Sequence, residues 1–308
     1  MKFPVFDLHC DTANELIGNL EVQYPSLRSN KAHIDLERAK ELGGYAQCFA
    51  CFSSTEEMGN PVDVFEKKMM AILREIDKNS DIIRLAYSAD DIIDNHANGL
   101  MSAILTIEGP AGFGFDPALL EDLYKVGFRI STLGWNEHNP LTGSHVTGGG
   151  LSDLGREYVR ELQRLGMLVD VSHISDEGFW DIIDITEGPV VATHSNCRAV
   201  YNVSRNITDD MFRAICSTGG VVGINLYAAF LGKNPTIDSV CDHIFHFLEL
   251  DPEGKHISLG GDLDGCDVFP EGFTGIESYS MLSDRLLERG LDNKMIYNIF
   301  WNNALEVM

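Results

Sequence analysis

Short apolar runs rich in β-branched residues alternate along the chain with longer stretches in which apolar residues recur at helical spacing. Such runs are typical of buried strands, and i, i+3, i+4 spacing is typical of amphipathic helices. The pattern predicts strands at Val5–His9, Tyr45–Phe52, Ser102–Ile107, Gly127–Leu133, Met167–Ser172, Pro189–Thr193, Gly220–Asn225 and Ile257–Gly261. It predicts helices at Ile34–Leu42, Val62–Ile76, Ala118–Val126, Leu154–Leu165, Glu177–Ile185, Asp209–Ser217, Ile237–Leu248 and Tyr279–Glu288.

Eight predicted strands, each followed by a helix, account for most of the 308 residues. This number and order are typical of a closed (β/α)8 TIM barrel, an α/β fold of roughly 250 residues. A doubly wound open sheet also alternates strands with helices and is the competing architecture. No linker or low-complexity segment divides the chain, so we expect one domain over residues 1–308, closed by a C-terminal helix over Asn293–Met308.

Composition limits the partners of the chain. Apolar residues make up 44% of the sequence, and 47 acidic against 23 basic residues give a formal charge of −24. Nucleic acid and anionic membranes attract basic surfaces, so we expect neither as a partner. No signal peptide and no apolar run of roughly 18 residues is present, which predicts a cytoplasmic location. The seven cysteines then fit reduced core residues.

Candidate chemistry begins at the end of the first predicted strand, at His9 and Asp11. Residues two apart in a strand point to the same face, so the imidazole and the carboxylate are expected side by side. Both groups are ligands for a divalent metal such as zinc. Taken alone, the pair is more often a packed histidine followed by a helix-capping aspartate.

Other strands of the predicted barrel also end in ionisable residues, and barrel enzymes place their chemistry at those ends. These residues are Glu108, His173, His194 and Asp262. Gathering so many ionisable groups at one rim is costly unless a metal pairs them. A His/Asp pair, a His/His pair and one carboxylate between them suit two cations, and strand order makes Glu108 the bridging carboxylate.

The motifs at the strand ends resemble those of the membrane (renal-type) dipeptidases, peptidase family M19 of the amidohydrolase-like barrels. The resemblance depends on Asp7-Leu8-His9-Cys10-Asp11, Thr106-Ile107-Glu108-Gly109, Val169-Asp170-Val171-Ser172-His173, Ala192-Thr193-His194-Ser195 and Gly261-Asp262-Leu263-Asp264-Gly265. The connecting segment Gly150–Arg156 and the closing Trp301-Asn302-Asn303-Ala304 also look like the family, so the resemblance covers nearly the whole chain.

Carried over to this sequence, the resemblance implies one zinc ion on His9, Asp11 and Glu108 and a second on Glu108, His173 and His194. Arg205 matches the residue that binds the substrate's terminal carboxylate, a role that suits the two parallel donors of a guanidinium group. Asp262 matches the acid that contacts the substrate amine and moves the proton. Tyr227 is expected to line the pocket, with an ordinary packed tyrosine as the alternative.

One position departs from the family pattern. Many relatives carry a histidine at the end of the fourth strand, thought to support the tetrahedral intermediate, where this sequence has Trp135. His138 lies three residues further on and is the candidate replacement. The resemblance therefore leaves open how the oxyanion is stabilised. The remaining histidines are expected to be loop, helix-end or solvated helix-face residues: His33, His96, His145, His243, His246 and His256.

These observations predict a zinc-dependent hydrolase of small dipeptides, in which metals activate a water molecule and Asp262 transfers the proton. Cobalt or manganese remains possible in place of zinc. The alternatives are the same chemistry on N-acyl or D-amino-acid amides, and a metal-binding scaffold without activity. A homodimer is the habit of the resembled family and is expected on that ground alone.

Overall fold

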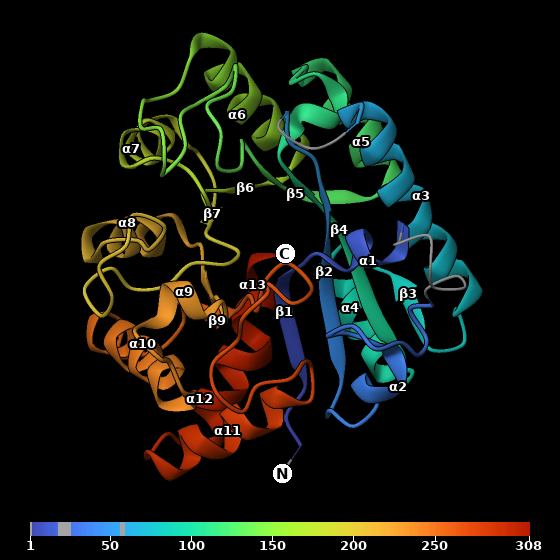
Figure 1. Ribbon diagram of the computed structural model, residues 1–308, viewed down its shortest axis with the longest axis vertical. Helices are drawn as coiled ribbons and strands as arrows, with labels where there is room; N and C mark the ends of the chain where they lie inside the picture. Colours follow the sequence, from blue (N-terminus) through green and yellow to red (C-terminus); the bar gives the residue numbers. More distant parts are fainter. Residues whose placement is uncertain (1, 18–25, 56–58) are drawn as a thin grey trace.

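The computed structural model describes residues 2–17, 26–55 and 59–308, and its parallel strands form a barrel surrounded by helices (Figure 1). The strands are β1 (Val5–Cys10), β2 (Tyr45–Phe52), β3 (Ile83–Leu85), β4 (Met101–Glu108), β5 (Phe128–Thr132), β6 (Leu168–Asp170), β7 (Val190–Val191), β8 (Val222–Ile224) and β9 (Ile257–Leu259). Every predicted strand is present, and β3 is an addition that the sequence pattern did not predict.

The strand order closes the sheet on itself. Hydrogen bonds connect the strands in the order β7-β6-β5-β4-β2-β1-β9-β8, all parallel, and β3 pairs with β4 outside this path. A parallel bridge between Ala192, which follows β7, and Val222 of β8 joins the two ends. The (β/α)8 barrel predicted from the sequence is confirmed, and the open doubly wound sheet is excluded.

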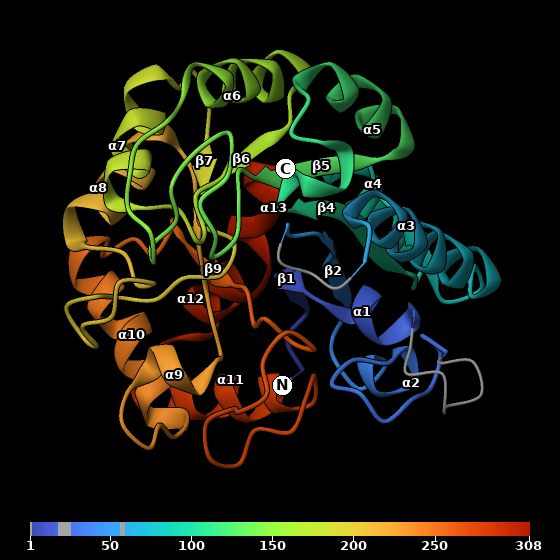
Figure 2. The same ribbon diagram turned by 45° about the horizontal axis from the view of Figure 1, so that its top comes forward.

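Helices cover the outside of the barrel, as the turned view shows (Figure 2). The predicted helices appear as α2 (Leu36–Ala39), α3 (Pro61–Lys78), α5 (Leu120–Val126), α6 (Asp153–Leu165), α7 (Asp176–Ile185), α8 (Asp209–Thr218), α10 (Ile237–Leu250) and α11 (Ser278–Glu288). Short segments that were not predicted are α1 (Thr12–Ile17), α4 (Ala89–Ala97), α9 (Ala228–Leu231) and the 3-10 turns η1 (Pro110–Phe113) and η2 (Pro117–Leu119).

The C-terminal segment packs against the barrel. It consists of α12 (Asn293–Tyr297), a π-helical turn η3 (Asn298–Asn302) and α13 (Asn303–Val307). Ile296, Ile299 and Phe300 are buried, as the pattern predicted. Trp301 packs on Phe6 of β1 with 6.0 Å between ring centroids, so this segment covers the amino-terminal half of β1. No helix in the described part of the chain is long and apolar enough to cross a membrane.

Candidate metal centre and active site

An extra residue in β1 directs His9 toward the strand tips. Asp7 pairs with Gln47 and Cys10 with Phe49, so β1 uses three steps where β2 uses two. Such a bulge reverses which residues face inward. Before it, Phe6 and Leu8 belong to an inner apolar cluster with residues of β2, β4, β5, β6 and β7; after it, Cys10 belongs to the outer core. His9 and Asp11 therefore lie at the mouth of the barrel instead of facing the helices.

Three carboxylates meet at the Nε2 atom of His9. The nearest carboxylate oxygens of Asp11, Glu108 and Asp262 lie 3.5, 3.4 and 3.8 Å from it. His9 is only 2% exposed, and its Nε2 atom has no hydrogen-bond partner among the described residues. A buried ring nitrogen surrounded by carboxylates but bonded to none of them is a donor set that a cation would complete.

Glu108, at the end of β4, also reaches the second pair of imidazoles. Its Oε1 atom lies 3.2 Å from His173 Nε2 and 3.8 Å from His194 Nε2, while its Oε2 atom is the one facing His9. The two oxygens of one carboxylate thus face different histidines. The structure brings together the five residues predicted as metal ligands, with Glu108 between the two groups.

Hydrogen bonds place the ring proton of His173 and of His194 on Nδ1, the nitrogen that faces away from Glu108. His173 Nδ1 lies 2.9 Å from Asn136 Oδ1, which only accepts, so this nitrogen carries the proton. His194 Nδ1 lies 2.8 Å from the Thr193 hydroxyl, whose own hydrogen is donated to Asp170. His194 must therefore donate to Thr193, and its Nε2 atom keeps a lone pair.

The two histidines therefore form an unfavourable contact between lone pairs. The Nε2 atoms of His173 and His194 lie 2.9 Å apart, and both present lone pairs. Burial, with nearby positive groups such as Arg205, lowers the pKa of both histidines well below the usual range, so neither carries an extra proton to bridge them. The residues present therefore fit a divalent metal at this position, beside Glu108.

The charges at the site lead to the same conclusion. Burial, then the nearby Asp11, raises the pKa of Glu108 to about 7 against the opposing effect of His9. Burial also raises the pKa of Asp262. Although burial opposes it, Glu108 and Asp11 raise the pKa of His9 well above its usual value. The site thus has a shortage of positive charge that bound cations would correct.

The contact between Thr193 and His194 allows a test of the second coordination shell. We expect Thr193→Val to weaken metal affinity about 10- to 100-fold, because His194 Nδ1 loses its acceptor and the ring loses its fixed orientation. Titration against a chelator measures the affinity. Thr106→Val is the matched control, since the buried Thr106 hydroxyl has no hydrogen-bond partner within the described residues. Equal metal affinity in both variants would contradict this role for Thr193.

Asp262 follows β9 and faces the cavity from a constrained backbone. Its φ of 57° is in the left-handed region, as is the φ of 70° at His173. Its Oδ2 atom accepts a hydrogen bond of 3.0 Å from Asn225 Nδ2, and its Oδ1 atom faces His9. A Cβ at Gly265 would lie 2.3 Å from Asp11 Oδ2 and 2.4 Å from Asp262 Oδ1, so only glycine leaves room for both carboxylates.

Arg205 is buried and only partly hydrogen-bonded. It is 4% exposed, and Nη1 donates to Ser195 Oγ at 2.8 Å. Its Nε and Nη2 atoms are buried and have no hydrogen-bond partner in the part of the chain that the structure describes. Burial lowers its pKa to about 10, so it stays charged at neutral pH. Arg205 is therefore not part of a surface ion pair, and it forms no ion pair with an acidic residue in the described chain.

The cavity above these residues has a volume of about 290 Å³ and aromatic walls. Trp135 meets Phe52 edge-on at 5.1 Å on one side, and Tyr227 meets Phe230 edge-on at 4.9 Å on the other. Tyr227 thus lines the cavity, as predicted. His138 is exposed and is not among the lining residues, so it does not take the place of the missing histidine.

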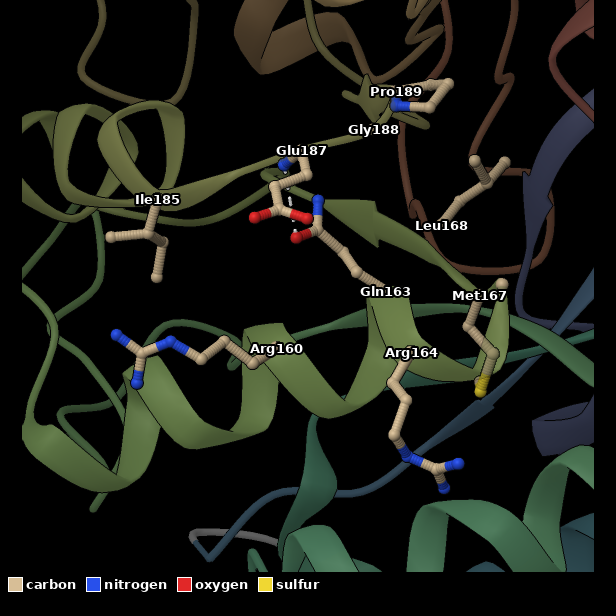
Figure 3. A pocket seen from close by; sticks show the side chains of 10 residues that line it. Arg160, Gln163, Arg164, Met167, Leu168, Ile185, Glu187, Gly188 and Pro189 are labelled. Carbon is tan, nitrogen blue, oxygen red and sulfur yellow. Dashed lines mark hydrogen bonds between the residues drawn. The ribbon is translucent and has the colours of Figure 1, made fainter.

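A larger cavity of about 650 Å³ lies elsewhere, between α6 and the start of β7 (Figure 3). Its two arginines, Arg160 and Arg164, extend apart from each other, and Glu187 contacts Gln163 through its backbone. It lacks a converging set of ionisable groups, so size alone does not make it a catalytic site.

Several residues of the site were missed by the sequence argument. Asn136 accepts from His173 and, at 2.9 Å, from His145 Nε2, so His145 is part of the site's surroundings and not an ordinary loop residue. His243 is fully buried, with Nδ1 accepting from the Cys197 backbone, and the expectation of a solvated helix face is wrong for it. No spacing rule would have found Asn136, because its role depends on a loop conformation.

The chain is similar to known proteins in both sequence and structure. A family model described as membrane dipeptidase (peptidase family M19) matches residues 1–308. An uncharacterized dipeptidase of Schizosaccharomyces pombe is 37% identical over 224 residues, which is 70% of this chain but only 54% of that relative's length. The structure of dipeptidase AC, a metallopeptidase of family M19, is 25% identical, with a TM-score of 0.90 and coverage of 100% and 98% of the two chains. A metallopeptidase from Rhodobacter sphaeroides, solved with a phosphinate mimic of L-Ala-D-Ala, is 24% identical, with a TM-score of 0.89 and coverage of 100% and 99%.

Proposed function

The chain belongs to the membrane dipeptidase family, peptidase family M19, a family of metallo-dipeptidases, and on that premise we propose that it hydrolyses the amide bond of small dipeptides. The observation that carries the proposal is the position of Glu108, whose two carboxylate oxygens face His9 on one side and His173 on the other.

We assign two divalent cations to this centre, one to His9, Asp11 and Glu108 and the other to Glu108, His173 and His194. Zinc suits the mixed imidazole and carboxylate ligands best, and cobalt or manganese would be accepted by the same donors. When bound, such cations lower the pKa of a coordinated water and polarise a carbonyl group. The fixed Nδ1 protons of His173 and His194 keep their Nε2 atoms available as ligands.

Substrate orientation is the task of Arg205 in this proposal. Its unpaired Nε and Nη2 atoms form one edge of the guanidinium group, which can hold both oxygens of a dipeptide's terminal carboxylate. Arg205 does not line the cavity itself, but its guanidinium carbon lies 5.6 Å from the ring centroid of Phe230, which does. The buried positive charge would select a free carboxylate over a neutral amide.

Proton transfer is the task of Asp262. Its pKa is raised by burial, which brings it closer to neutral pH and suits a group that first accepts and later donates a proton. Asn225 holds one oxygen, leaving the oxygen that faces His9 free to act. Asp262 would take the proton of the attacking water and deliver it to the leaving amine, which becomes the amino terminus of the second product.

We expect Arg205→Lys to lower kcat/KM for dipeptides about 10- to 100-fold, mainly through KM, because lysine keeps the charge but loses the two parallel donors. The measurement compares each dipeptide with its C-terminal amide. The native enzyme should prefer the free carboxylate strongly and the variant should not. An unchanged preference in the variant would show that the carboxylate is bound elsewhere.

The proposed function as a whole is tested with a panel of L,L-, L,D- and D-configured dipeptides and N-acyl amino acids, with zinc supplied. Because a Rhodobacter sphaeroides metallopeptidase of the same fold was solved with a phosphinate mimic of L-Ala-D-Ala, L-Ala-D-Ala belongs in this panel. If only N-acyl amino acids are hydrolysed, they are the substrate class and dipeptides are not. No hydrolysis of any substrate would favour a metal-binding scaffold. We also propose that residues 1–308 form one catalytic domain and that the protein assembles as a homodimer.

A further inference from the structure

Amide hydrolysis through a tetrahedral intermediate places negative charge on the former carbonyl oxygen. In this cavity the charge would develop beside three carboxylates, those of Asp11, Glu108 and Asp262. Arg205 is already assigned to the terminal carboxylate of the substrate and Asp262 to proton transfer. Besides the cations assigned to this centre, stabilising the intermediate therefore calls for a hydrogen-bond donor fixed in the wall of the cavity near the metal ligands.

Asn136 meets this requirement. It follows β5 in the loop that carries Trp135, and it lines the cavity together with Glu108 and Asp262. Its Oδ1 atom accepts two hydrogen bonds, from His173 Nδ1 and from His145 Nε2, each of 2.9 Å. Its backbone oxygen accepts from Ser144 Oγ at 2.6 Å. Its Nδ2 group has no hydrogen-bond partner in the described residues.

The orientation of this amide group is fixed by its neighbours. Because Nε2 of His173 is assigned to a metal, its Nδ1 atom carries the proton and must meet the accepting oxygen of Asn136, which leaves the NH2 group as the free end of the amide. His145 is itself held through Nδ1, which lies 3.0 Å from Ser204 Oγ. The Nδ2 hydrogens are thus held in place before substrate arrives, which makes a donor effective in a transition state.

We propose that Asn136 is a catalytic residue whose side-chain amide donates a hydrogen bond to the carbonyl oxygen of the scissile bond as it becomes an oxyanion. This inference rests on the proposed dipeptidase function. It assigns one side chain two tasks, since the oxygen orients His173 and the nitrogen meets the substrate. It also explains how the oxyanion is stabilised although the chain has Trp135 where many relatives have a histidine.

Asn136→Asp separates the two tasks, because a carboxylate still accepts from both imidazoles but no longer donates. Removing one such donor lowers kcat about 10²- to 10³-fold. We expect that loss in the zinc-loaded variant, with KM within about threefold and zinc content equal to that of the native protein. The Kd of a dipeptide phosphinate, whose tetrahedral oxygens mimic the intermediate, should rise by a similar factor when measured by calorimetry.

Asn136→Leu removes both tasks and should lose kcat together with zinc affinity, whereas His138→Gln, an exposed position on the same loop, is the matched control. Native kcat and native phosphinate affinity in Asn136→Asp would overturn the proposal. So would a loss of kcat in Trp135→Phe without one in Asn136→Asp, because the indole would then be the donor. Calorimetry requires no turnover, so a native protein without dipeptidase activity would refute the proposed function while the phosphinate comparison still tests Asn136.

Discussion

Replacing Asp262 with asparagine is expected to lower kcat for dipeptide hydrolysis about 10²- to 10⁴-fold while the protein keeps its metal. Asparagine occupies the same space and can still accept from Asn225, but it can neither take up nor release a proton at neutral pH. Steady-state kinetics on a dipeptide, with metal content measured on the same sample, checks this result.

The control for Asp262→Asn is Asp284→Asn, an exposed aspartate of α11. It makes the same chemical change at an exposed position of an outer helix and should leave kcat unchanged. If Asp262→Asn hydrolyses dipeptides at the native rate with full metal content, the proton is carried by another group. If the variant loses metal instead, Asp262 acts as a ligand and its assignment as proton carrier is wrong.

Replacing Glu108 with glutamine is expected to reduce bound metal from about two ions to one or fewer per chain and to lower kcat about 10³-fold or more. The amide lacks the charge that offsets two neighbouring cations, and only one of its two polar atoms can accept. Metal analysis and kinetics on protein reconstituted under the same conditions check both parts.

A second measurement on Glu108→Gln distinguishes a ligand from a structural residue. In the metal-free native protein, burial and the nearby Asp11 raise the pKa of Glu108 to about 7, so at pH 8 its buried negative charge is a cost to folding. The metal-free variant should therefore melt at or above the temperature of the metal-free native protein. The order should reverse once metal is added. Lower stability of the variant in both states would contradict the assignment.

Much of the barrel was predictable because each strand is a short buried run whose ends are marked by polar residues. β2 was predicted at its observed bounds, and the strands with shorter observed ladders, such as β7, were predicted too long. The predicted terminal residues of β7, Pro189 and Thr193, lie outside the strand, where the chain turns into the loops. β3 was missed because its three residues include the exposed Arg84 and form no apolar run.

The site was predictable to the extent that barrel strands bring their carboxyl ends to one rim. His9, Glu108, His173, His194 and Asp262 converge there, and strand order alone placed Glu108 centrally. The bulge in β1 was not predictable, since alternation counted from Phe6 and Leu8 would turn His9 outward.

Residues that act through loop geometry were beyond the sequence argument. Asn136 has no distinguishing neighbours in sequence and is identified only by the two imidazoles that meet its oxygen. Thr193 and Asp170 belong to the recognised motifs. Their role in fixing the proton of His194 is visible only in the structure. The donors that hold a ligand in place follow from three-dimensional contacts more than from residue spacing.

The central claim is a shared two-cation site built around Glu108. The most direct test starts from native protein stripped of metal with a chelator. The protein is titrated with zinc while dipeptide hydrolysis is followed, and elemental analysis gives the bound metal. We predict saturation at two zinc ions per chain, with no activity in the metal-free protein and full activity at the second ion. Saturation at one ion, or dipeptide hydrolysis by the metal-free protein, would contradict it.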